Sequence, residues 1–480
     1  MSFASAQYLI FLLACLLLYG LAPGKWRWLV LLSASYAFYA LWHWQVLWVL
    51  ALITLSSYWA ARQIARAESR KGKNGWLAAG LAVVLVLLGT FKYFGYLAQI
   101  TARLFFKGSA PVSLVDVIAP LGISFFSLQV IAYLMDVSRG QIEPETNLGQ
   151  YALFVAFFPQ LVAGPITRAQ KLLPQVKSLP PVLPGELAAG FNRILWGALQ
   201  KFVIADRLAQ LTDPIFAAPQ DYSAALLLAN LYLYAVQIYA DFAGYSNIAI
   251  GVAKLFGAEL AENFNQPYLA KDVADFWNRW HISLSRWLRD YIFYPVMRFM
   301  RRRWKDGARV WFMLIPPVVT MLVSGVWHGA GPKFVLWGFL HGGMLALAAL
   351  TASWRQRVAE RLGKAARWFE RVQIIVTLNF VVFAWVFFRL PGMQASMNYL
   401  QLTFLGNTGV LELDQAQNWV VLVVLAIFLL METFRYHGIT LQNLNRAPLP
   451  LRWGVYYLFI FLILFLGNFT GSQPFIYEQF

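Results

Sequence analysis

The sequence predicts an all-α protein that crosses a membrane many times. Of its 480 residues, 60% are hydrophobic and only 13% are charged, and the mean hydropathy of +0.56 is far above that of an ordinary soluble domain. Apolar segments near the roughly 20 residues that a helix needs to cross a bilayer recur along the whole chain. Together these observations predict a polytopic protein whose residues 1–480 form one integral-membrane domain.

The net charge of +17 is concentrated in three short basic segments. Residues 62–74, 298–309 and 355–371 hold 17 of the 39 Lys and Arg residues. Basic residues that gather beside apolar segments in this way are typical of loops kept on the cytoplasmic side of a membrane. We therefore place the three segments in the cytoplasm. We expect no nucleic-acid partner, because the clustering needs no nucleic-acid-binding module to explain it.

Twelve apolar segments are long enough, or nearly so, to cross the bilayer. The first is expected to be a retained span, because no basic region precedes it and no small-residue cleavage site follows it, as they would in a signal peptide. With the basic segments in the cytoplasm, an even number of spans leaves both termini outside. The predicted spans are residues 7–23, 28–43, 46–61, 76–98, 117–135, 189–211, 223–250, 310–328, 334–352, 372–390, 419–433 and 453–470.

Residues 151–168 are apolar but contain breaks at Pro159, Gly164 and Pro165. Proline interrupts a helix, and interrupted backbone at membrane depth must be buried within protein, because lipid cannot form hydrogen bonds with it. We therefore expect a re-entrant element here rather than a full span.

Residues 272–291, DVADFWNRWHISLSRWLRDY, carry seven ionisable side chains in an otherwise lipid-like chain. Such a density is costly beside a bilayer and indicates function, although an interfacial structural helix explains it equally well. Apolar residues recur at intervals of three and four, which predicts one amphipathic helix with Asp272 as its N-cap and His281 at the boundary between protein and water. The apolar face comprises Val273, Phe276, Trp277, Trp280, Leu284, Trp287, Leu288 and Tyr291, opposite Arg279, Arg286 and Arg289.

Among the five histidines, His328 has the context that most strongly indicates function. It lies in SGVWHGAGP, where flanking glycines allow backbone and substrate to approach closely. An ionisable group at membrane depth is functional by default, with a buried, hydrogen-bonded structural residue as the alternative. His341 follows thirteen residues later in FLHGG, and we expect it to be structural.

Several kinds of chemistry lack their motifs in this sequence. No two histidines are spaced i, i+4, no HExxH motif occurs, and no carboxylate lies one turn from His328, so we expect no metal site. The lone Cys15 excludes an intramolecular disulfide and a thiolate cluster. A G-x-S-x-G elbow and a phosphate-binding P-loop are also missing. What remains is general-base catalysis, in which a neutral imidazole deprotonates an acceptor hydroxyl while a second group orients it.

Two stretches closely resemble the membrane-bound O-acyltransferases. They are DFWNRWHISLSRWLRDYIFYP at 275–295 and SGVWHGAGPKFVLWG at 324–338. The narrower resemblance is to the bacterial branch that O-acetylates exopolysaccharides such as alginate or cellulose, together with its relative that D-alanylates teichoic acid. Further matches run through most of the chain in the same order, among them PLGISFFSLQVIAYLMDVSRG at 120–140, NFNQPY at 263–268 and PFIYEQF at 474–480.

The resemblance implies a ring of helices around a central tunnel and a role for particular residues. His328 matches the family's invariant histidine, the expected general base, and His281 matches the second signature position, which is expected to orient substrate. Trp327 is expected to shape the tunnel. The other candidates are Ser324 and Asn247 as hydrogen-bond partners, Arg286 as part of a basic helix that meets an anionic donor, and Asp241 as a carboxylate paired with an arginine of helix 272–291.

The resemblance also implies a donor, a partner and a location. It implies that no cofactor is tightly bound and that acetyl-CoA in the cytoplasm is the acyl donor. A periplasmic partner enzyme of an exopolysaccharide machine would receive the acetyl group across the bacterial inner membrane. Because the parity of the spans places the terminal PFIYEQF outside, we expect this segment to dock the partner. Three alternatives stay open: D-alanyl transfer to teichoic acid from a carrier-protein thioester, a transporter of a lipid-linked sugar or acyl group, and a non-catalytic scaffold.

Overall fold

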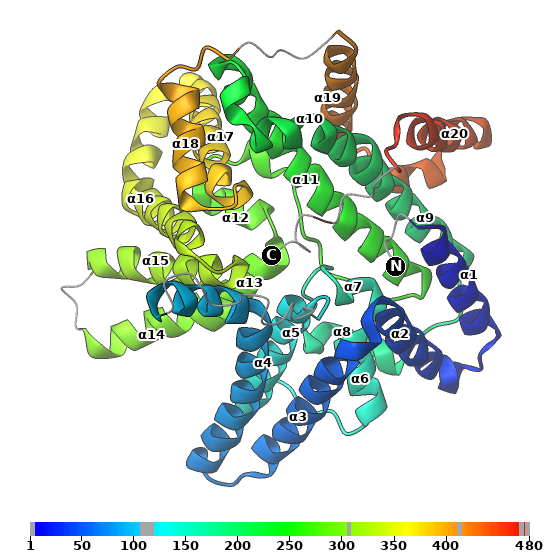
Figure 1. The fold of residues 1–480 in the computed structure, drawn as a ribbon. Helices are drawn as coiled ribbons and strands as arrows, with labels where there is room; N and C mark the ends of the chain where they lie inside the picture. The colour runs from blue at the N-terminus through cyan, green and yellow to red at the C-terminus, as the bar shows by residue number, and fades with distance from the viewer. Residues whose placement is uncertain (1–4, 106–119, 305–308, 410–414, 470–474, 476–480) are drawn as a thin grey trace. The chain divides into compact units, whose positions relative to one another are not determined.

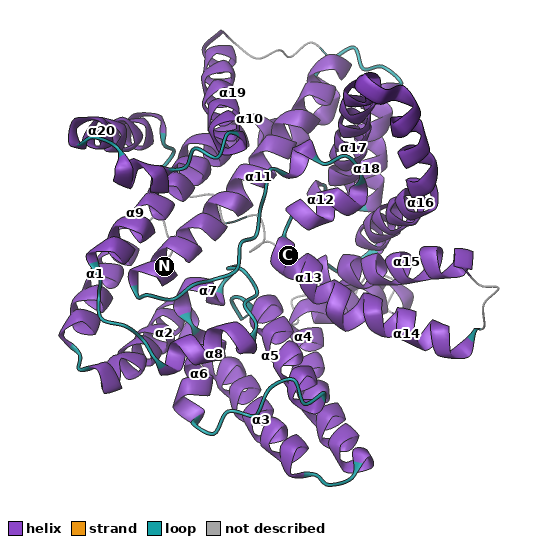
Figure 2. Cartoon of the chain, turned by 180° about the vertical axis from the view of Figure 1, so that it is seen from behind, coloured by secondary structure: helices purple, strands orange, loops and turns teal. Residues whose placement is uncertain are grey.

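The regular elements of the protein are helices, as expected for an all-α chain (Figures 1 and 2). The computed structural model describes residues 5–105, 120–304, 309–409, 415–469 and Phe475. Within these ranges the only β-type pairing is an isolated bridge between Ser223 and Thr408. The predicted docking segment 474–480 lies outside the described residues, except for Phe475.

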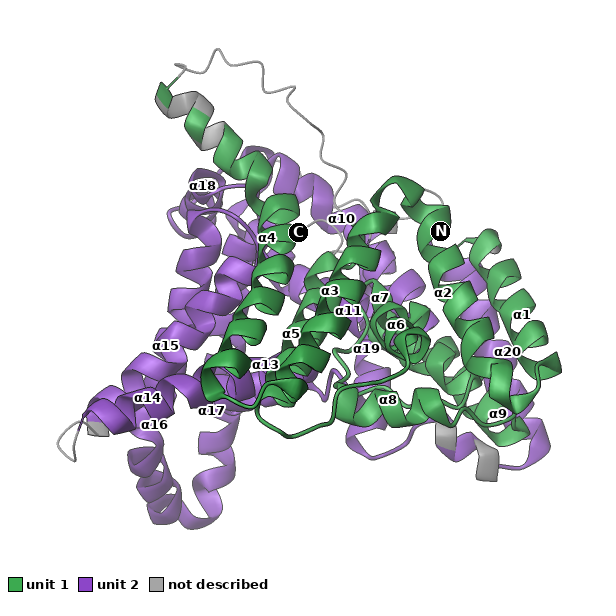
Figure 3. Cartoon of the chain, turned by 90° about the horizontal axis from the view of Figure 1, so that it is seen from below, with its two compact units in different colours: residues 1–196, 245–261, 477–479 green, residues 197–244, 262–476, 480 purple. Residues whose placement is uncertain are grey.

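The chain divides into two compact units, coloured green and purple in Figure 3. Unit 1 comprises residues 1–196, 245–261 and 477–479, and unit 2 comprises residues 197–244, 262–476 and 480. Helix α11 (Ala224–Leu255) contributes residues to both units. All three histidines of interest, His281, His328 and His341, belong to unit 2.

Unit 1 is built mainly from the first nine α-helices. Helices α3, α4 and α5 pack against one another, and α2 packs against α6. The helices are α1 (Ala6–Leu21), α2 (Arg27–His43), α3 (Leu47–Arg66), α4 (Arg70–Phe105), α5 (Ile123–Ser138), α6 (Leu148–Ala156), α7 (Phe158–Leu161), α8 (Ala169–Lys177) and α9 (Pro184–Ala198).

The segment expected to be re-entrant is broken and buried. Helix α6 ends at Ala156, α7 covers only Phe158–Leu161, and residues 151–167 are all buried. Side chains of unit 1 supply hydrogen bonds where the helix is interrupted. Gln129 Nε2 donates to the carbonyl of Phe154 at 2.9 Å, and the N–H of Phe158 donates to Ser35 Oγ at 3.1 Å. These bonds satisfy backbone groups that could find no partner in lipid.

Unit 2 holds the remaining helices and two π-helical turns. The π-helical turns are Leu199–Ala205 and Arg289–Phe293, and such turns occur often at functional sites. Besides the first part of α11, the helices are α10 (Asp206–Ala217), α12 (Val273–Arg279), α13 (Ile282–Leu288), α14 (Tyr294–Arg303), α15 (Arg309–His328), α16 (Pro332–Leu362), α17 (Ala366–Arg389), α18 (Met393–Phe404), α19 (Gln415–Tyr436) and α20 (Leu449–Leu466).

Within the described residues, seven helical stretches are long and apolar enough to cross a membrane. Two of them, Gly24–Arg66 and Pro332–Arg389, each contain two predicted spans. The other five are Arg70–Ala98, Ala224–Leu255, Val310–His328, Gln417–Tyr436 and Leu449–Leu466, and two shorter apolar helices are Gln7–Leu21 and Ile123–Ser138. A multi-pass membrane protein is confirmed. The number of spans and the ring around a tunnel stay predictions.

The prediction of one continuous helix over residues 272–291 is wrong. Asp272 caps α12 as expected, because its side chain accepts the N–H of Asp275 at 2.8 Å, but α12 ends at Arg279. His281 then adopts a left-handed backbone conformation with φ of 42°, and α13 begins after it. The predicted apolar face is nevertheless buried along its whole length.

Loop 262–266 provides the physical reason for this break. The N–H of Ile282 donates to the carbonyl of Asn263 at 2.9 Å, and the N–H of Asn265 donates to the carbonyl of Arg279 at 2.9 Å. In a continuous helix the Ile282 N–H would instead bond to the carbonyl four residues earlier. Backbone pairing with the loop therefore replaces helical hydrogen bonds at this point.

Helices α15 and α16 approach each other closely because glycines line their contact. A Cβ atom on Gly325 would lie 2.2 Å from the carbonyl oxygen of Phe334, and one on Gly338 would lie 2.3 Å from that of Met321. Neither oxygen can move away without moving backbone. Small residues allow membrane helices to pack at such short distances, and here the contact brings the end of α15, where His328 lies, against α16.

We predict that Gly338→Ala destabilises the protein by about 1–3 kcal/mol, the usual cost of forcing an extra group into a packed core. Gly343→Ala is the matched control, because Gly343 lies on the same helix and a Cβ there would meet nothing within 4 Å. Both substitutions replace glycine by alanine within α16, so both raise the helix propensity by the same amount. Thermal unfolding of the purified full-length protein measures the difference, and equal melting temperatures for the two variants would contradict the prediction.

Candidate active site

Three buried histidines lie along one row of aromatic rings in unit 2. His281 precedes α13, His328 ends α15, and His341 lies in α16. Ring centroids are 6.5 Å apart for His281 and Trp327, 4.8 Å for Trp327 and His328, 5.1 Å for His328 and Trp337, and 4.6 Å for Trp337 and His341. The histidines expected to act together therefore both contact Trp327.

His281 is fully buried, which corrects the expectation that it faces water. The Phe242 ring packs edge-on at 4.6 Å, and Nδ1 of His281 lies 3.1 Å from Oδ1 of Asn263. Burial lowers the pKa of the His281 imidazole to about 3, because an imidazolium would lose its hydration here. The ring is therefore neutral at physiological pH.

The side-chain oxygen of Asn263 has a fixed orientation. Besides His281, it accepts the backbone N–H of Ser283 at 3.2 Å and the hydroxyl of Ser283 at 2.8 Å. Sequence reasoning missed Asn263 as a site residue. Asn263 is the first residue of NFNQPY, a stretch that already matched the family. Nothing in the sequence alone places Asn263 beside His281, which lies 18 residues further on.

His328 is packed between α16 and the end of α17. Its ring lies 5.3 Å from that of Phe388, and the buried Lys333 holds the same end of α17. Lys333 Nζ donates to the carbonyls of Leu390 at 2.5 Å and of Phe388 at 3.4 Å. A cation at the C-terminus of a helix donates hydrogen bonds to its free carbonyls and interacts favourably with the helix dipole. Lys333 is a second residue that the sequence analysis did not identify.

His341 accepts a hydrogen bond from an indole. Trp277 Nε1 donates to His341 Nδ1 at 3.3 Å, and the Trp277 ring also packs edge-on against Trp337. His341 is fully buried. The contact holds Trp277 in place, and the structural role expected for His341 stays a prediction.

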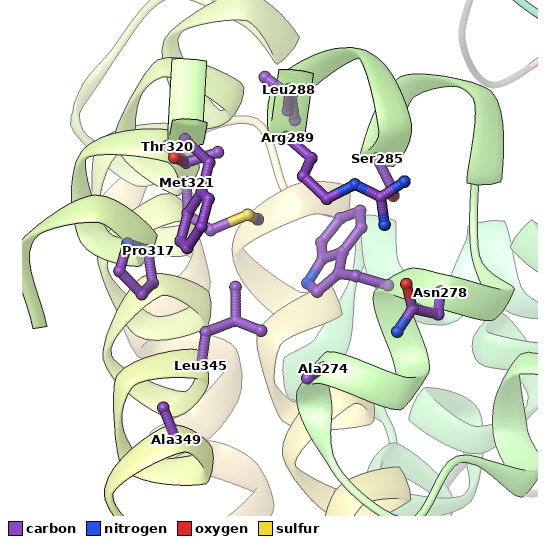
Figure 4. A pocket seen from close by; sticks show the side chains of 12 residues that line it. Ala274, Asn278, Ser285, Leu288, Arg289, Pro317, Thr320, Met321, Leu345 and Ala349 are labelled. Atoms are coloured by element: carbon purple, nitrogen blue, oxygen red, sulfur yellow. The ribbon is translucent and has the colours of Figure 1, made fainter. Parts of the chain in front are cut away.

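Trp277 also lines a cavity of about 330 Å³ within unit 2 (Figure 4). In Figure 4, Pro317, Thr320 and Met321 face Asn278, Ser285 and Arg289 across it. Most of its lining residues are apolar. The polar atoms Trp277 Nε1 and Thr320 Oγ1 already have hydrogen-bond partners within the protein. Its lining residues are Ala274, Trp277, Asn278, Ser285, Leu288, Arg289, Phe293, Pro317, Thr320, Met321, Leu345 and Ala349.

For three other predicted site residues, the structure gives a position but no role. Ser324 lies one turn before His328 on α15, and its buried hydroxyl has no hydrogen-bond partner among the described residues. Asn247 belongs to unit 1. Arg286 is exposed and does not line the cavity, whereas Arg289 does. The roles predicted for Ser324, Asn247 and Arg286 stay predictions.

Asp241 forms an ion pair, but its partner differs from the expected arginine. Lys201 Nζ lies 2.7 Å from Asp241 Oδ1 and 2.8 Å from Asp206 Oδ1, and all three side chains are largely buried. Lys201 lies in the π-helical turn Leu199–Ala205. A cation between two carboxylates in an apolar environment is a structural brace, because each charge would otherwise lack compensation.

Comparison with known proteins identifies the family. The family model of MBOAT, the membrane-bound O-acyltransferases, matches residues 143–396, which include His281, His328 and His341. The chain belongs to the membrane-bound O-acyltransferase family. It is therefore an O-acyltransferase, and the resemblance seen in its motifs is confirmed.

Relatives of this MBOAT protein include acetyltransferases of several bacteria. It is 33% identical to the probable alginate O-acetylase AlgI of Azotobacter vinelandii, over 93% of this chain and 87% of that protein. It is 36% identical to the protein of the same name from Pseudomonas aeruginosa, over 87% and 77% of the two chains. It is 33% identical to the peptidoglycan O-acetyltransferase of Helicobacter pylori, over 78% and 72%.

We predict that Lys201→Met destabilises the protein by about 3–5 kcal/mol, because it leaves two buried carboxylates without a cation. Lys271→Met is the control, since Lys271 pairs with Glu370 on the surface and such pairs contribute about 0–1 kcal/mol. Thermal unfolding and membrane abundance measure both effects. Adding Asp206→Asn and Asp241→Asn to Lys201→Met should restore part of the stability, and no recovery would contradict a charge effect.

Proposed function

We propose that the protein transfers an acetyl group from cytoplasmic acetyl-CoA towards the O-acetylation of an exopolysaccharide such as alginate or cellulose. The observation that carries the proposal is the buried aromatic row in which both His281 and His328 contact Trp327. Two relatives named as probable alginate O-acetylases, similar over most of the chain, support a polysaccharide as the final recipient of the acetyl group. The three basic segments support an orientation in the bacterial inner membrane with the donor side in the cytoplasm.

In the proposed reaction His328 is the general base. Its imidazole takes the proton from an acceptor hydroxyl, and the oxygen attacks the thioester carbonyl of the donor. A C–O bond forms, the C–S bond breaks, and the leaving CoA thiolate takes up the proton that His328 holds. His281 orients the reacting group. Both imidazoles are almost completely shielded from solvent, which favours transfer over hydrolysis of the thioester.

Two features support a CoA thioester as donor. The cavity beside Trp277 has an apolar wall for an uncharged portion of the donor and the cation Arg289 for a phosphate. Its volume lies at the lower end of the usual range for ligand pockets, so it would hold one portion of CoA rather than the whole. Further arginines, Arg301 to Arg303, end the neighbouring helix α14 and add positive charge for an anionic donor.

The proposed acceptor is a periplasmic partner enzyme that carries the acetyl group on to the polymer. This division of labour explains how a cytoplasmic donor can serve a polymer on the other side of the membrane. The protein would then act on the hydroxyl of its partner and need no polysaccharide-binding domain of its own.

We predict that His328→Ala reduces acetyl transfer by about a hundredfold to ten-thousandfold, the usual contribution of a general base. The measurement is polymer-linked acetate in cells that contain the polysaccharide machinery, with membrane abundance of each variant determined in the same samples. His281→Asn should reduce transfer as well. His437→Ala is the control, because His437 is exposed at the end of α19. Normal acetylation by abundant His328→Ala protein would contradict the proposal and favour a transporter or a scaffold.

We also predict that Arg289→Gln raises the KM for acetyl-CoA about tenfold with little change in kcat. A charge-assisted hydrogen bond to a non-reacting phosphate stabilises the bound substrate and the transition state equally, so its loss weakens binding without slowing the chemical step. Transfer from labelled acetyl-CoA in membrane preparations provides the measurement. Arg298→Gln, at an exposed arginine of α14 that does not line the cavity, is the matched control. Equal effects of the two substitutions would contradict a specific role for Arg289.

A further inference from the structure

We propose that Asn263 is a positioning residue that holds His281 in one tautomer, with hydrogen on Nδ1 and the acceptor lone pair on Nε2. The functional part of this inference rests on the proposed acyl transfer. The residue lies in the stretch NFNQPY, to which nothing above assigns a function. Three steps lead from the geometry to the tautomer.

The first step identifies which atom of the Asn263 amide faces His281. A backbone N–H can only donate a hydrogen bond, and that of Ser283 points at the same Asn263 atom, 3.2 Å away, that His281 contacts. This atom must therefore be the carbonyl oxygen Oδ1 and not the NH₂ group. The Ser283 hydroxyl, 2.8 Å from the same atom, then also acts as a donor.

The second step follows from the properties of that oxygen. A carbonyl oxygen accepts hydrogen bonds and cannot donate them, so the His281 nitrogen at 3.1 Å, Nδ1, carries the hydrogen. In a neutral imidazole the other nitrogen, Nε2, then holds the lone pair. Phe242 and Trp327, whose rings pack on His281, carry no charge that would favour an imidazolium.

The third step concerns how firmly Asn263 is held. Its own carbonyl accepts the N–H of Ile282, and loop 262–266 is bonded to α19 at two points within unit 2. Gln266 Nε2 donates to the carbonyl of Glu432 at 2.8 Å, and Arg435 donates to the carbonyl of Phe264. The loop therefore brings Asn263 to His281 as part of a fixed arrangement rather than as a mobile side chain.

His341 shows that the tautomer of a histidine in this cluster depends on its partner. Its Nδ1 faces the indole N–H of Trp277, which can only donate, so His341 carries its hydrogen on Nε2. Two buried histidines of one aromatic row are thus held in opposite tautomers. Of these two histidines, it is His281 whose Nε2 is an acceptor, which suits it to receive a hydrogen bond from a substrate hydroxyl and to orient that hydroxyl.

The tautomer can be measured without any assumption about the reaction. Solid-state NMR of the full-length protein in lipid bilayers, with ¹⁵N-labelled histidine, distinguishes protonated from unprotonated ring nitrogens, and comparison with His281→Gln assigns the His281 signals. We expect hydrogen on Nδ1 in the parent protein and in Asn263→Asp, whose carboxylate is also an acceptor. Asn263→Leu should lose this signature. Hydrogen on Nε2 of His281 in the parent protein would overturn the proposal.

Activity then tests the functional part. Asn263→Leu should reduce acetyl transfer by about tenfold to a hundredfold, as when a partner that orients a ligand histidine is removed. Asn263→Asp should retain transfer near neutral and alkaline pH. On acidification its activity should fall at a higher pH than that of the parent protein, because a carboxylate favours the imidazolium form of His281 and so raises its pKa. The exposed Asn265, two residues away, provides the control Asn265→Leu, which should leave transfer unchanged.

The outcomes separate this inference from the proposed function. If the parent protein transfers acetyl groups but Asn263→Leu and Asn263→Asp lose activity equally and with the same pH profile, the positioning role is wrong and Asn263 serves only the fold. If the parent protein transfers no acetyl group at all, the proposed function is wrong, while the NMR experiment still decides the tautomer.

Discussion

The break between α12 and α13 is the constraint on which the site depends. Backbone pairing of residues 263–265 with residues 279–282 replaces helical hydrogen bonds and leaves His281 with a left-handed backbone. Such a conformation costs a non-glycine residue about 1–2 kcal/mol. The bonds made by Asn263 to Ile282 and Ser283 offset this cost. The result is that His281 lies in the protein interior rather than along the surface of an amphipathic helix.

Close packing of α15 against α16 supplies the second half of the site. Gly325 and Gly338 leave no room for side chains at the contact, so His328 at the end of α15 packs against Trp337 of α16. Lys333 adds the end of α17 to the same cluster through its bonds to backbone carbonyls. His281 and His328 thus come from separate elements, each held by contacts that do not involve the imidazoles themselves.

Two largely buried lysines of unit 2 are compensated by the groups around them. Lys201 lies between Asp206 and Asp241, and Lys333 meets the C-terminal carbonyls of a helix. An uncompensated charge in the same environment would be strongly destabilising. The buried His281, by contrast, remains neutral because its pKa is lowered. His281, the residue proposed to orient the reacting group, therefore needs no compensating charge beside it.

The sequence by itself determined the class of the protein and much of its local structure. Hydropathy predicted helices that the structure contains, prolines and glycines predicted the interrupted segment at 151–168, and Asp272 was recognisable as an N-cap. The motifs around His281 and His328 also indicated the acyltransferase family, which the comparisons confirmed. These features depend on composition and on neighbours a few residues apart, and both are visible in a sequence.

Only the tertiary structure decided how the site is assembled. Helical periodicity placed His281 at the edge of a continuous helix. A periodic pattern contains no information about Asn263, whose side chain bonds to His281 from 18 residues earlier in the chain. The partner of Asp241 was likewise assigned to an arginine, while the structure provides Lys201, 40 residues earlier in the chain. The capping role of Lys333 depends on the end of α17, more than fifty residues later. Each of these contacts joins segments distant in sequence, and only the fold brings such segments together.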